Sequence, residues 1–340
     1  MKKKSKFLQN LNPSQIKVGV IGLGLMGSSI TSCLLAAGHE VIALDISTDK
    51  RKTAKKRILR DLKDLQKEKI LKESPIAALK RLTVTADYHS LKPCTIAVEA
   101  TFEDLNTKRA VIQSLEKVLV KNAIICLNTS ALPITLLQQG AKNPKRILGV
   151  HWAEPAYLTR FMEVICGNNS DMKFANMIMH MAVKWKKEPT LVKKDIRGFI
   201  TNRLMYALIR EAFYLVESGV TTIEGVDRSM RNDLGSWITF AGPFRMMDLT
   251  GIPAYRAVMR DLLPNLNNAK TIPKLMNKVA DSGALGTANH KGFYRYTPAQ
   301  AKQWDKRFAE FSRDIRRLSL SYAEPADKPK KKRKVNKKSK

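Results

Sequence analysis

The sequence predicts an α/β fold in which a doubly wound parallel sheet is followed by an all-α C-terminal domain. Two observations support this prediction. Short apolar runs alternate with helical segments through the first half of the chain, which is typical of a parallel sheet with crossover helices. From about Ile196 onwards, helical periodicity continues and strand-like runs are nearly absent.

The first apolar run leads into a turn that fits the pattern G-x-G-x-x-G and consists of Gly22, Leu23, Gly24, Leu25, Met26 and Gly27. Gly22 permits the tight turn, Gly24 lets the backbone approach a pyrophosphate, and Gly27 lets the next helix pack closely. The free N–H groups of that helix then face the phosphates. Asp45 ends the second apolar run, where an acid would accept hydrogen bonds from the adenosine ribose. The pattern alone would fit any glycine-rich turn, but this order of elements predicts a Rossmann domain that binds NAD through the turn and Asp45.

Ser47 or Thr48 is expected to cap a long basic helix, which Ser74-Pro75 interrupts. In the second domain a long helix is predicted at 200–218, and Thr222 caps the next one. Further strands of the first domain are predicted at 81–85, 95–99, 123–127, 147–150 and 161–165. The expected segments are a Rossmann domain at 16–195, a helical domain at 196–322 and a basic disordered tail at 323–340.

The chain carries a formal net charge of +31, concentrated at its two ends and in residues 50–72. Such a charge attracts polyanions, including nucleic acid and anionic cofactors. Solvated helix faces and a disordered tail also account for the basic ends. We therefore expect at most a non-specific association of the tails with nucleic acid.

Four widely spaced cysteines form no C-x-x-C motif, so buried free thiols in a reducing compartment are expected rather than disulfides or a metal site. The N-terminus lacks the apolar core of a signal peptide. No apolar run approaches the roughly 20 residues that span a bilayer. The sequence predicts a soluble cytoplasmic protein with no membrane segment and no metal.

Four polar residues occupy positions suited to chemistry: Ser130, His151, Glu163 and Asn202. Each has a simpler explanation, because Ser130 and Asn202 could cap helices, His151 could be structural and Glu163 could be a surface charge. Together they suit the oxidation of a secondary alcohol. Histidine can take the hydroxyl proton near neutral pH, and a carboxylate behind the ring stabilises the imidazolium that forms. Ser130 and Asn202 would hold the hydroxyl or a neighbouring carbonyl.

Several motifs occur in one order along the chain, namely 22–27 with Asp45, 98–100, 128–132, 149–151, Glu163-Val164, 198–203, 241–244 with Asp248, and 292–296. Taken together they resemble the 3-hydroxyacyl-CoA dehydrogenase family, from Lys17 to about Tyr296. The resemblance implies NAD-dependent oxidation of a short-chain 3-hydroxyacyl-CoA, such as 3-hydroxybutyryl-CoA, to the 3-oxoacyl-CoA in fatty acid metabolism.

The resemblance also implies roles for particular residues. His151 would be the catalytic base and Glu163 its partner, while Ser130 and Asn202 would bond to the substrate. Glu99 and Asn128 would contact the cofactor. The basic residues 50–72 would lie near the phosphates of CoA, and the helical domain would form a homodimer.

Three features depart from the family pattern. Glu154 stands where the family usually has asparagine, and a carboxylate is unexpected beside a CoA thioester. Arg197 replaces a proline before Gly198. The last helical segment, which contains Trp304, resembles the extended C-terminus of gulonate or carnitine dehydrogenases, which oxidise free hydroxy acids.

Two alternative functions therefore remain open. One is a dehydrogenase of a free 3-hydroxy acid with the same catalytic residues. The other is a non-catalytic NAD-binding protein with basic tails that associate with nucleic acid, although such a binder has no use for a base. Residues 329–335 match the nuclear-localisation heptapeptide of a viral tumour antigen, which we interpret as a chance product of a lysine-rich tail.

Overall fold

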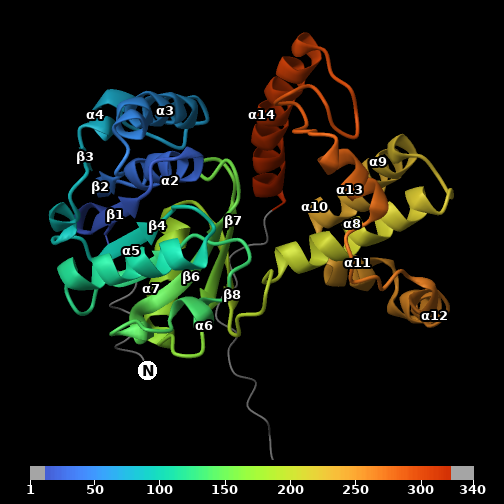
Figure 1. Cartoon of the computed structure of the whole chain (residues 1–340), viewed down its shortest axis with the longest axis horizontal. Coiled ribbons are helices and arrows are strands. Elements are labelled where there is room, and N and C mark those ends of the chain that lie inside the picture. The colour runs from blue at the N-terminus through green and yellow to red at the C-terminus, as the bar shows by residue number, and fades with distance from the viewer. Residues whose placement is uncertain (1–11, 323–340) are drawn as a thin grey trace, which may run out of the picture. The chain divides into compact units, whose positions relative to one another are not determined.

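A computed structural model describes residues 12–322 and divides the chain into two compact units, Met1–Leu208 and Ile209–Lys340 (Figure 1). We refer to them as the sheet unit and the helical unit. The predicted tail at 323–340, with its lysine-rich heptapeptide, lies outside the described residues.

The sheet unit contains eight strands: β1 (Lys17–Ile21), β2 (Glu40–Leu44), β3 (Leu82–Thr85), β4 (Ile96–Glu99), β5 (Ile124–Leu127), β6 (Ile147–Trp152), β7 (Phe161–Cys166) and β8 (Glu188–Val192). They form one sheet in the order β3-β2-β1-β4-β5-β6-β7-β8. The first six strands in the chain pair in parallel, as the doubly wound prediction requires. The α/β fold class is therefore confirmed, with the two differences described below.

The first difference is that β7 runs antiparallel to β6, whereas we expected parallel strands throughout. The connection between them, residues 153–160, is shorter than the dozen or more residues that a parallel crossover needs. The second difference is β8, which the sequence analysis missed. This strand pairs with β7 at the sheet edge, where Pro189 is tolerated because the outer N–H groups need no partner strand.

Helices cover both faces of the sheet (Figure 1). The main helices of the sheet unit are α2 (Leu25–Ala36), α3 (Thr48–Lys67), α4 (Pro75–Leu79), α5 (Leu105–Val118), α6 (Ile134–Leu137) and α7 (Met172–Lys184). One core cluster includes fully buried side chains of α2, α3 and α7, such as Ile30, Ile58 and Ile178. A second cluster includes Leu115 of α5 and Leu137 of α6. Two separate clusters on one sheet are what a doubly wound architecture produces.

Side-chain caps set the starts of several helices. Ser47 caps α3, as one of the two predicted alternatives, and Ser74 caps α4 with Pro75 in its first turn. Helix α3 ends at Lys67, and Lys69 then adopts a left-handed backbone conformation with φ of 57°. The long basic helix is therefore slightly shorter than the sequence suggested.

The helical unit is all-α, as predicted. Its first helix, α8 (Thr201–Glu217), begins in the sheet unit, and the others are α9 (Ile223–Asn232), α10 (Leu234–Phe240), α11 (Gly242–Thr250), α12 (Ile252–Leu262), α13 (Lys274–Asp281) and α14 (Pro298–Ser321). Thr222 caps α9 as expected, and Thr297 with Gln300 forms a capping box on α14. Within residues 12–322, no helix is both long and apolar enough to cross a bilayer.

Candidate active site

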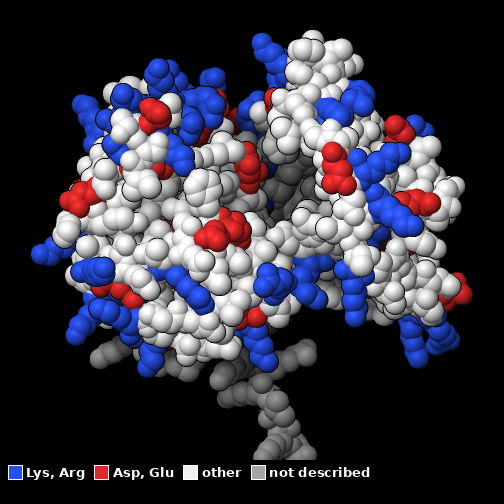
Figure 2. Space-filling view, in the orientation of Figure 1, with Lys and Arg blue, Asp and Glu red and all other residues white. Residues whose placement is uncertain are grey.

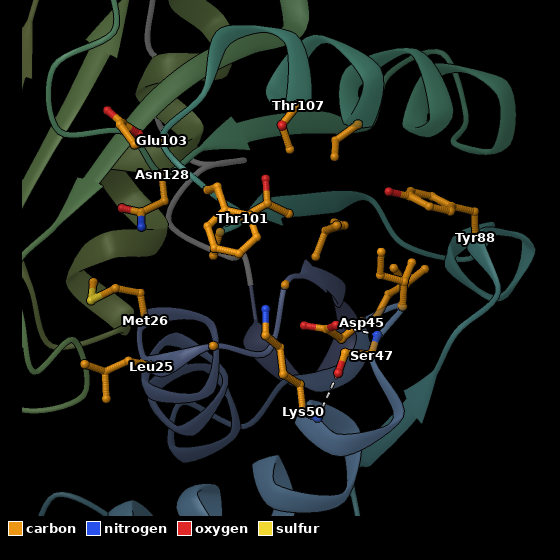
Figure 3. Close-up of a pocket in the computed structure, with 18 of the residues that line it drawn as sticks. Leu25, Met26, Asp45, Ser47, Lys50, Tyr88, Thr101, Glu103, Thr107 and Asn128 are labelled. Carbon is orange, nitrogen blue, oxygen red and sulfur yellow. Dashed lines mark hydrogen bonds between the residues drawn. The ribbon is translucent and has the colours of Figure 1, made fainter.

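A cavity of about 550 Å³ lies at the carboxyl edge of the sheet, where β1, β2, β4 and β5 end (Figure 3). In a doubly wound sheet, ligands bind at this edge. The glycine-rich turn forms one wall. Gly22 has a φ of 94°, and a Cβ there would lie 2.6 Å from the Ala100 carbonyl oxygen. A Cβ on Gly27 would lie 1.7 Å from the Gly22 oxygen, so close packing of α2 requires glycine at this position.

Gly24, by contrast, has open space around its missing Cβ and lines the cavity at the N-cap of α2. With no side chain to cap the helix, the first turn of α2 offers its N–H groups to a bound anion. Leu25 and Met26 also line the cavity, while the Leu23 side chain is fully buried. The turn therefore suits a pyrophosphate. Leu23 and Gly27 contribute to the packing of the turn and do not line the cavity.

Asp45 is nearly buried at the end of β2. Its Oδ2 accepts a hydrogen bond from the Leu23 N–H at 2.7 Å, and its Oδ1 accepts one from the Ser47 N–H at 2.8 Å. Each carboxylate oxygen retains a lone pair for a ribose hydroxyl. The same carboxylate also braces the glycine-rich turn. The Arg51 guanidinium is directed away from this carboxylate and donates to the backbone oxygens of Asp45 and Ile46.

Glu99 does not lie where the sequence analysis expected it. Its side chain is fully buried, and its carboxylate accepts hydrogen bonds from Thr101 and, at 2.7 Å, from the Lys108 ammonium. Lys108 is equally buried and also donates to the Asn128 carbonyl oxygen. The predicted direct contact between Glu99 and a cofactor does not fit this geometry. Glu99 and Lys108 instead form an ion pair behind the cavity wall, which fixes Thr101 and Asn128 at its surface.

Sequence reasoning missed Glu103, which lines the cavity beside Asn128 (Figure 3). Its Oε1 accepts hydrogen bonds from the Thr129 hydroxyl and from the N–H groups of Ser130 and Ala131. Burial raises the pKa of Glu103. These hydrogen bonds and the charge of Lys108 lower it by more, so the net shift of the pKa is downward. Its position just beyond the carboxyl end of β4 is the one sequence signal that could have identified it.

His151 and Glu163 face each other across β6 and β7. They are partners in the antiparallel register, and His151 Nδ1 lies 2.9 Å from Glu163 Oε2. The unexpected reversal of β7 is therefore what brings the two side chains together. Because Nδ1–H donates to the carboxylate, the second ring nitrogen, Nε2, is left as the basic atom. Phe161 packs edge-on against the ring, with centroids 5.2 Å apart.

Glu163 also connects this pair to the start of α8. Its Oε1 accepts hydrogen bonds from the N–H groups of Ile200 and Thr201, at 3.2 and 3.1 Å. Burial works to raise the pKa of Glu163, whereas the hydrogen bonds from His151 and Thr201 and the charge of His151 lower it. The net shift is downward, so the carboxylate form is favoured.

The other two predicted residues belong to the same constellation. The Asn202 side-chain amide, one residue beyond Thr201, donates to the Ser130 carbonyl oxygen at 2.7 Å. Ser130 lines the cavity, and Asn128 Oδ1 accepts a hydrogen bond from the Trp152 N–H, next to His151. The structure thus brings segments 128–130, 151–163 and 201–202 together, and of these residues Asn128 and Ser130 line the cavity.

Contacts made by Lys187 and Tyr157 hold the loop that connects β6 and β7. Lys187 is almost buried, donates to the carbonyl oxygens of Ala156 and Thr159, and lies 5.2 Å from the centre of the Trp152 ring. The Tyr157 hydroxyl donates to Asp64 of α3. Glu154, the departure noted above, is exposed on this loop. In the part of the chain that the structure describes, no three acidic, histidine or cysteine side chains are grouped as metal ligands.

Comparison with known proteins agrees with this architecture. The family model described as "3-hydroxyacyl-CoA dehydrogenase, NAD binding domain" matches residues 17–196, and that of the "3-hydroxyacyl-CoA dehydrogenase, C-terminal domain" matches residues 198–296. A 3-hydroxybutyryl-CoA dehydrogenase of Bradyrhizobium diazoefficiens is 31% identical over 84% of this chain and 96% of its own length.

A second relative has a different substrate. The 5-formyl-3-hydroxy-2-methylpyridine 4-carboxylate 5-dehydrogenase of Mesorhizobium japonicum is 28% identical over 84% of this chain and 92% of its own length. The crystal structure of a dehydrogenase of the same name, described as NAD⁺-dependent, matches 90% of this chain and 98% of its own with a TM-score of 0.83 at 27% identity. The 3-hydroxybutyryl-CoA dehydrogenase of Ralstonia eutropha matches 83% of this chain and 99% of its own with a TM-score of 0.69 at 26% identity.

Proposed function

Because the chain belongs to the 3-hydroxyacyl-CoA dehydrogenase family and is an NAD-dependent oxidoreductase of that type, we propose that it oxidises a short-chain 3-hydroxyacyl-CoA to the 3-oxoacyl-CoA. The observation that carries this proposal is the hydrogen bond between His151 and the buried Glu163, next to Trp152, whose N–H donates to the cavity-lining Asn128. A protein that only binds NAD has no need of such a pair.

In the proposed mechanism, His151 Nε2 would take the proton of the substrate hydroxyl, and NAD, when bound, would supply the acceptor for the hydride from the same carbon. Glu163 holds the ring through Nδ1 and stabilises the imidazolium as it forms. Ser130 and Asn202 would orient the hydroxyl or the neighbouring carbonyl. The hydrogen bond from the Asn202 amide to the Ser130 carbonyl oxygen holds Asn202 beside Ser130, which lines the cavity.

The proposed cofactor contacts are those of the residues that line the cavity. Gly22, Gly24 and Met26 would face the pyrophosphate, Asp45 the adenosine ribose, and Asn128 the nicotinamide side. The Asp45 carboxylate would repel a 2′-phosphate, so that NAD should bind more tightly than NADP.

The proposed CoA surface is the outer face of α3. Its exposed cations are Lys52, Lys55, Lys56, Arg60, Lys63 and Lys67. Figure 2 shows a concentration of Lys and Arg over the region of α3 and α4. If these groups attract the phosphates of CoA, the KM for an acyl-CoA should rise with salt, because exposed charges are screened within about 10 Å at 0.1 M ionic strength.

A free hydroxy acid is the second candidate substrate. One observation favours it: the TM-score of 0.83 to a dehydrogenase named for a pyridine carboxylate. The catalytic residues would be the same. The absence of CoA would leave the basic face of α3 without a role in the reaction.

We also propose that the helical unit forms a homodimer and that the protein works in the cytoplasm. Within the described residues, Cys33, Cys94, Cys126 and Cys166 are buried and form no disulfide, which is compatible with a reducing compartment. Support for the dimer comes from the large apolar side chains that the helical unit exposes, such as Phe308 and Phe311 of α14.

The test is spectrophotometric NADH formation and consumption with purified full-length protein. Substrates would be 3-hydroxybutyryl-CoA and acetoacetyl-CoA alongside free 3-hydroxybutyrate, gulonate and carnitine. We expect the highest kcat/KM with the CoA pair, and a kcat roughly 10²- to 10⁴-fold lower in a His151→Gln control. Turnover confined to the free acids would replace the acyl-CoA proposal with the second candidate, and no turnover of either class would contradict both.

A further inference from the structure

The side chains of Lys50 and Phe102, which both line the cavity, contact each other. Phe102 follows β4 and is 71% exposed, although it lines the cavity. The Lys50 ammonium lies 4.9 Å from the centre of the Phe102 ring. An ammonium over an aromatic face is attracted by the ring quadrupole, but weakly so at an exposed site. The contact therefore joins two walls of the cavity and can open readily.

The backbones on both sides of this contact are fixed. The Lys50 N–H donates to the Ser47 hydroxyl in the cap of α3. On the other side, Thr101 is bound to the buried Glu99, and the Asp104 N–H donates to the Phe102 carbonyl oxygen. The two side chains thus extend from rigid turns, and Figure 3 shows the Lys50 side chain reaching from α3 into the cavity toward Thr101.

The charge balance of the cavity gives Lys50 a distinct position. Among the described residues that line this cavity, Lys50 is the one Lys or Arg, whereas Asp45 and Glu103 are both acidic. Arg51 is engaged with backbone oxygens, and Lys108 is paired with Glu99 behind the wall. A dinucleotide that enters brings two further negative charges on its pyrophosphate. The N–H groups of α2 can meet these charges on one side, and Lys50 is the cation available on the other.

We propose that Lys50 and Phe102 form a clasp across the nucleotide cavity, in which the Lys50 ammonium binds the pyrophosphate of NAD and the Phe102 ring holds that ammonium in place. Lys50 is then an affinity-determining residue, and Phe102 is a positioning residue that acts through it. The clasp contributes to cofactor binding and not to hydride transfer. This inference rests on the proposed placement of NAD in this cavity.

The test compares the dissociation constants of NAD, ADP and adenosine, measured by calorimetry, for the wild type and four variants. Lys50→Met keeps the apolar stem and removes the charge, and Lys50→Arg keeps the charge. Phe102→Leu removes the aromatic face. Lys52→Met is the matched control, because Lys52 is exposed on the same helix and does not line the cavity.

We expect Lys50→Met to raise the Kd of NAD and ADP roughly tenfold, since a hydrogen bond to a charged group is worth about that factor. Adenosine, which has no phosphate, should bind with unchanged affinity. Phe102→Leu should raise the Kd of NAD about threefold, because the cation–π contact is weak. Lys50→Arg and Lys52→Met should keep a Kd of NAD within about twofold of the wild type. The salt dependence of log Kd should be shallower in Lys50→Met alone.

Equal NAD affinity in Lys50→Met and Lys52→Met would overturn the clasp. Weaker adenosine binding in Lys50→Met would contradict the assignment to the pyrophosphate. Failure of the wild type to bind NAD at all would instead contradict the proposed function, so the two failures are distinguishable.

Discussion

The sheet unit and the helical unit differ in how far their apolar side chains are buried. In the sheet unit, helices cover both faces of the sheet, and side chains such as Val20, Ile58 and Leu137 are fully buried in two clusters. Among residues 209–322 of the helical unit, only Ala301 and Arg316 are buried. The helices of this unit are nevertheless amphipathic, and α14 places Phe308, Phe311 and Leu318 at helical spacing with 50–62% of their surface exposed.

The difference shows which unit is stabilised by apolar burial within itself. Apolar burial is the dominant favourable term in folding, at about 25 cal/mol for each Å² removed from water. The sheet unit has this stabilisation within itself, and it holds the cavity together with His151 and Glu163. The helical unit lacks it, which supports the proposal that a second copy covers its exposed faces. The predictions below test this contrast.

The largest expected effect is a loss of catalysis in the sheet unit. His151→Gln removes the base but keeps a hydrogen-bonding side chain, so kcat should fall by roughly 10²- to 10⁴-fold. The Kd of NAD, measured by calorimetry, should stay within about twofold of the wild type, because His151 does not line the nucleotide cavity. A variant with near-normal turnover would refute the proposed mechanism.

A smaller effect is expected at the exposed face of the helical unit. Replacing Phe308 and Phe311 together by serine should weaken the dimer about thirtyfold or more, since buried aromatic anchors often contribute about 2 kcal/mol to an interface. Sedimentation equilibrium would measure this, with Lys302→Ser on the same helix as the control. A wild-type protein that is monomeric at all concentrations would contradict the proposed dimer, because the helical unit would then be stable with its apolar faces exposed.

Glu163→Gln should cost less than the loss of the base, about tenfold in kcat, because the ring remains while its orientation and charge support weaken. Steady-state kinetics of the wild type and the variant would measure this loss. A Glu163→Gln enzyme that loses as much activity as His151→Gln would contradict the supporting role of Glu163.

The smallest effect concerns acid stability in the sheet unit. His39 is fully buried, with Nδ1 2.8 Å from the Ile16 carbonyl oxygen and Nε2 accepting from the Trp185 indole N–H. Burial lowers the pKa of His39 below its ordinary value of 6.5. Below pH 6.5 the unfolded chain therefore binds a proton that the folded chain does not.

The free energy of unfolding should then fall as the pH drops from about 6.5 towards the folded pKa, by at most about 1.4 kcal/mol per pH unit from this group. Urea unfolding between pH 7.5 and 5 would measure the slope. His39→Gln should have a shallower slope than the wild type in this window, whatever its stability at neutral pH. An unchanged slope would show that the folded and unfolded chains protonate His39 equally, which would contradict the effect of its burial.

Local signals made much of the fold predictable. The glycine-rich turn, Asp45 and the caps at Ser47 and Thr222 act through residues close in sequence, and the structure has all of them in their expected elements. The reversal of β7 and the edge strand β8 depend on connection length and on the partner strand, which single runs of residues do not encode. The same limit explains why β8, with Glu188 and Pro189, was missed.

Site prediction followed the same pattern. His151 and Glu163 could be paired because the family motifs fix their positions, but the physical cause, an antiparallel register, is visible only in the structure. Glu99 was expected to contact the cofactor, but its carboxylate accepts a hydrogen bond from Lys108, nine residues further along the chain. The exposure of the helical unit was likewise not predictable, because an amphipathic helix has the same sequence pattern whether its partner is in the same chain or in another one.

The most direct test of the central claim, hydride transfer from a secondary alcohol to NAD in the sheet unit, is an isotope experiment. 3-Hydroxybutyryl-CoA carrying deuterium on C3, and in parallel free 3-hydroxybutyrate labelled in the same way, would be incubated with NAD and the full-length protein. Mass spectrometry would then locate the label. The account predicts deuterium on the nicotinamide ring of the NADH that forms, at a rate lowered by roughly 10²- to 10⁴-fold in His151→Gln. Deuterium released to water, or oxidation without labelled NADH, would contradict it.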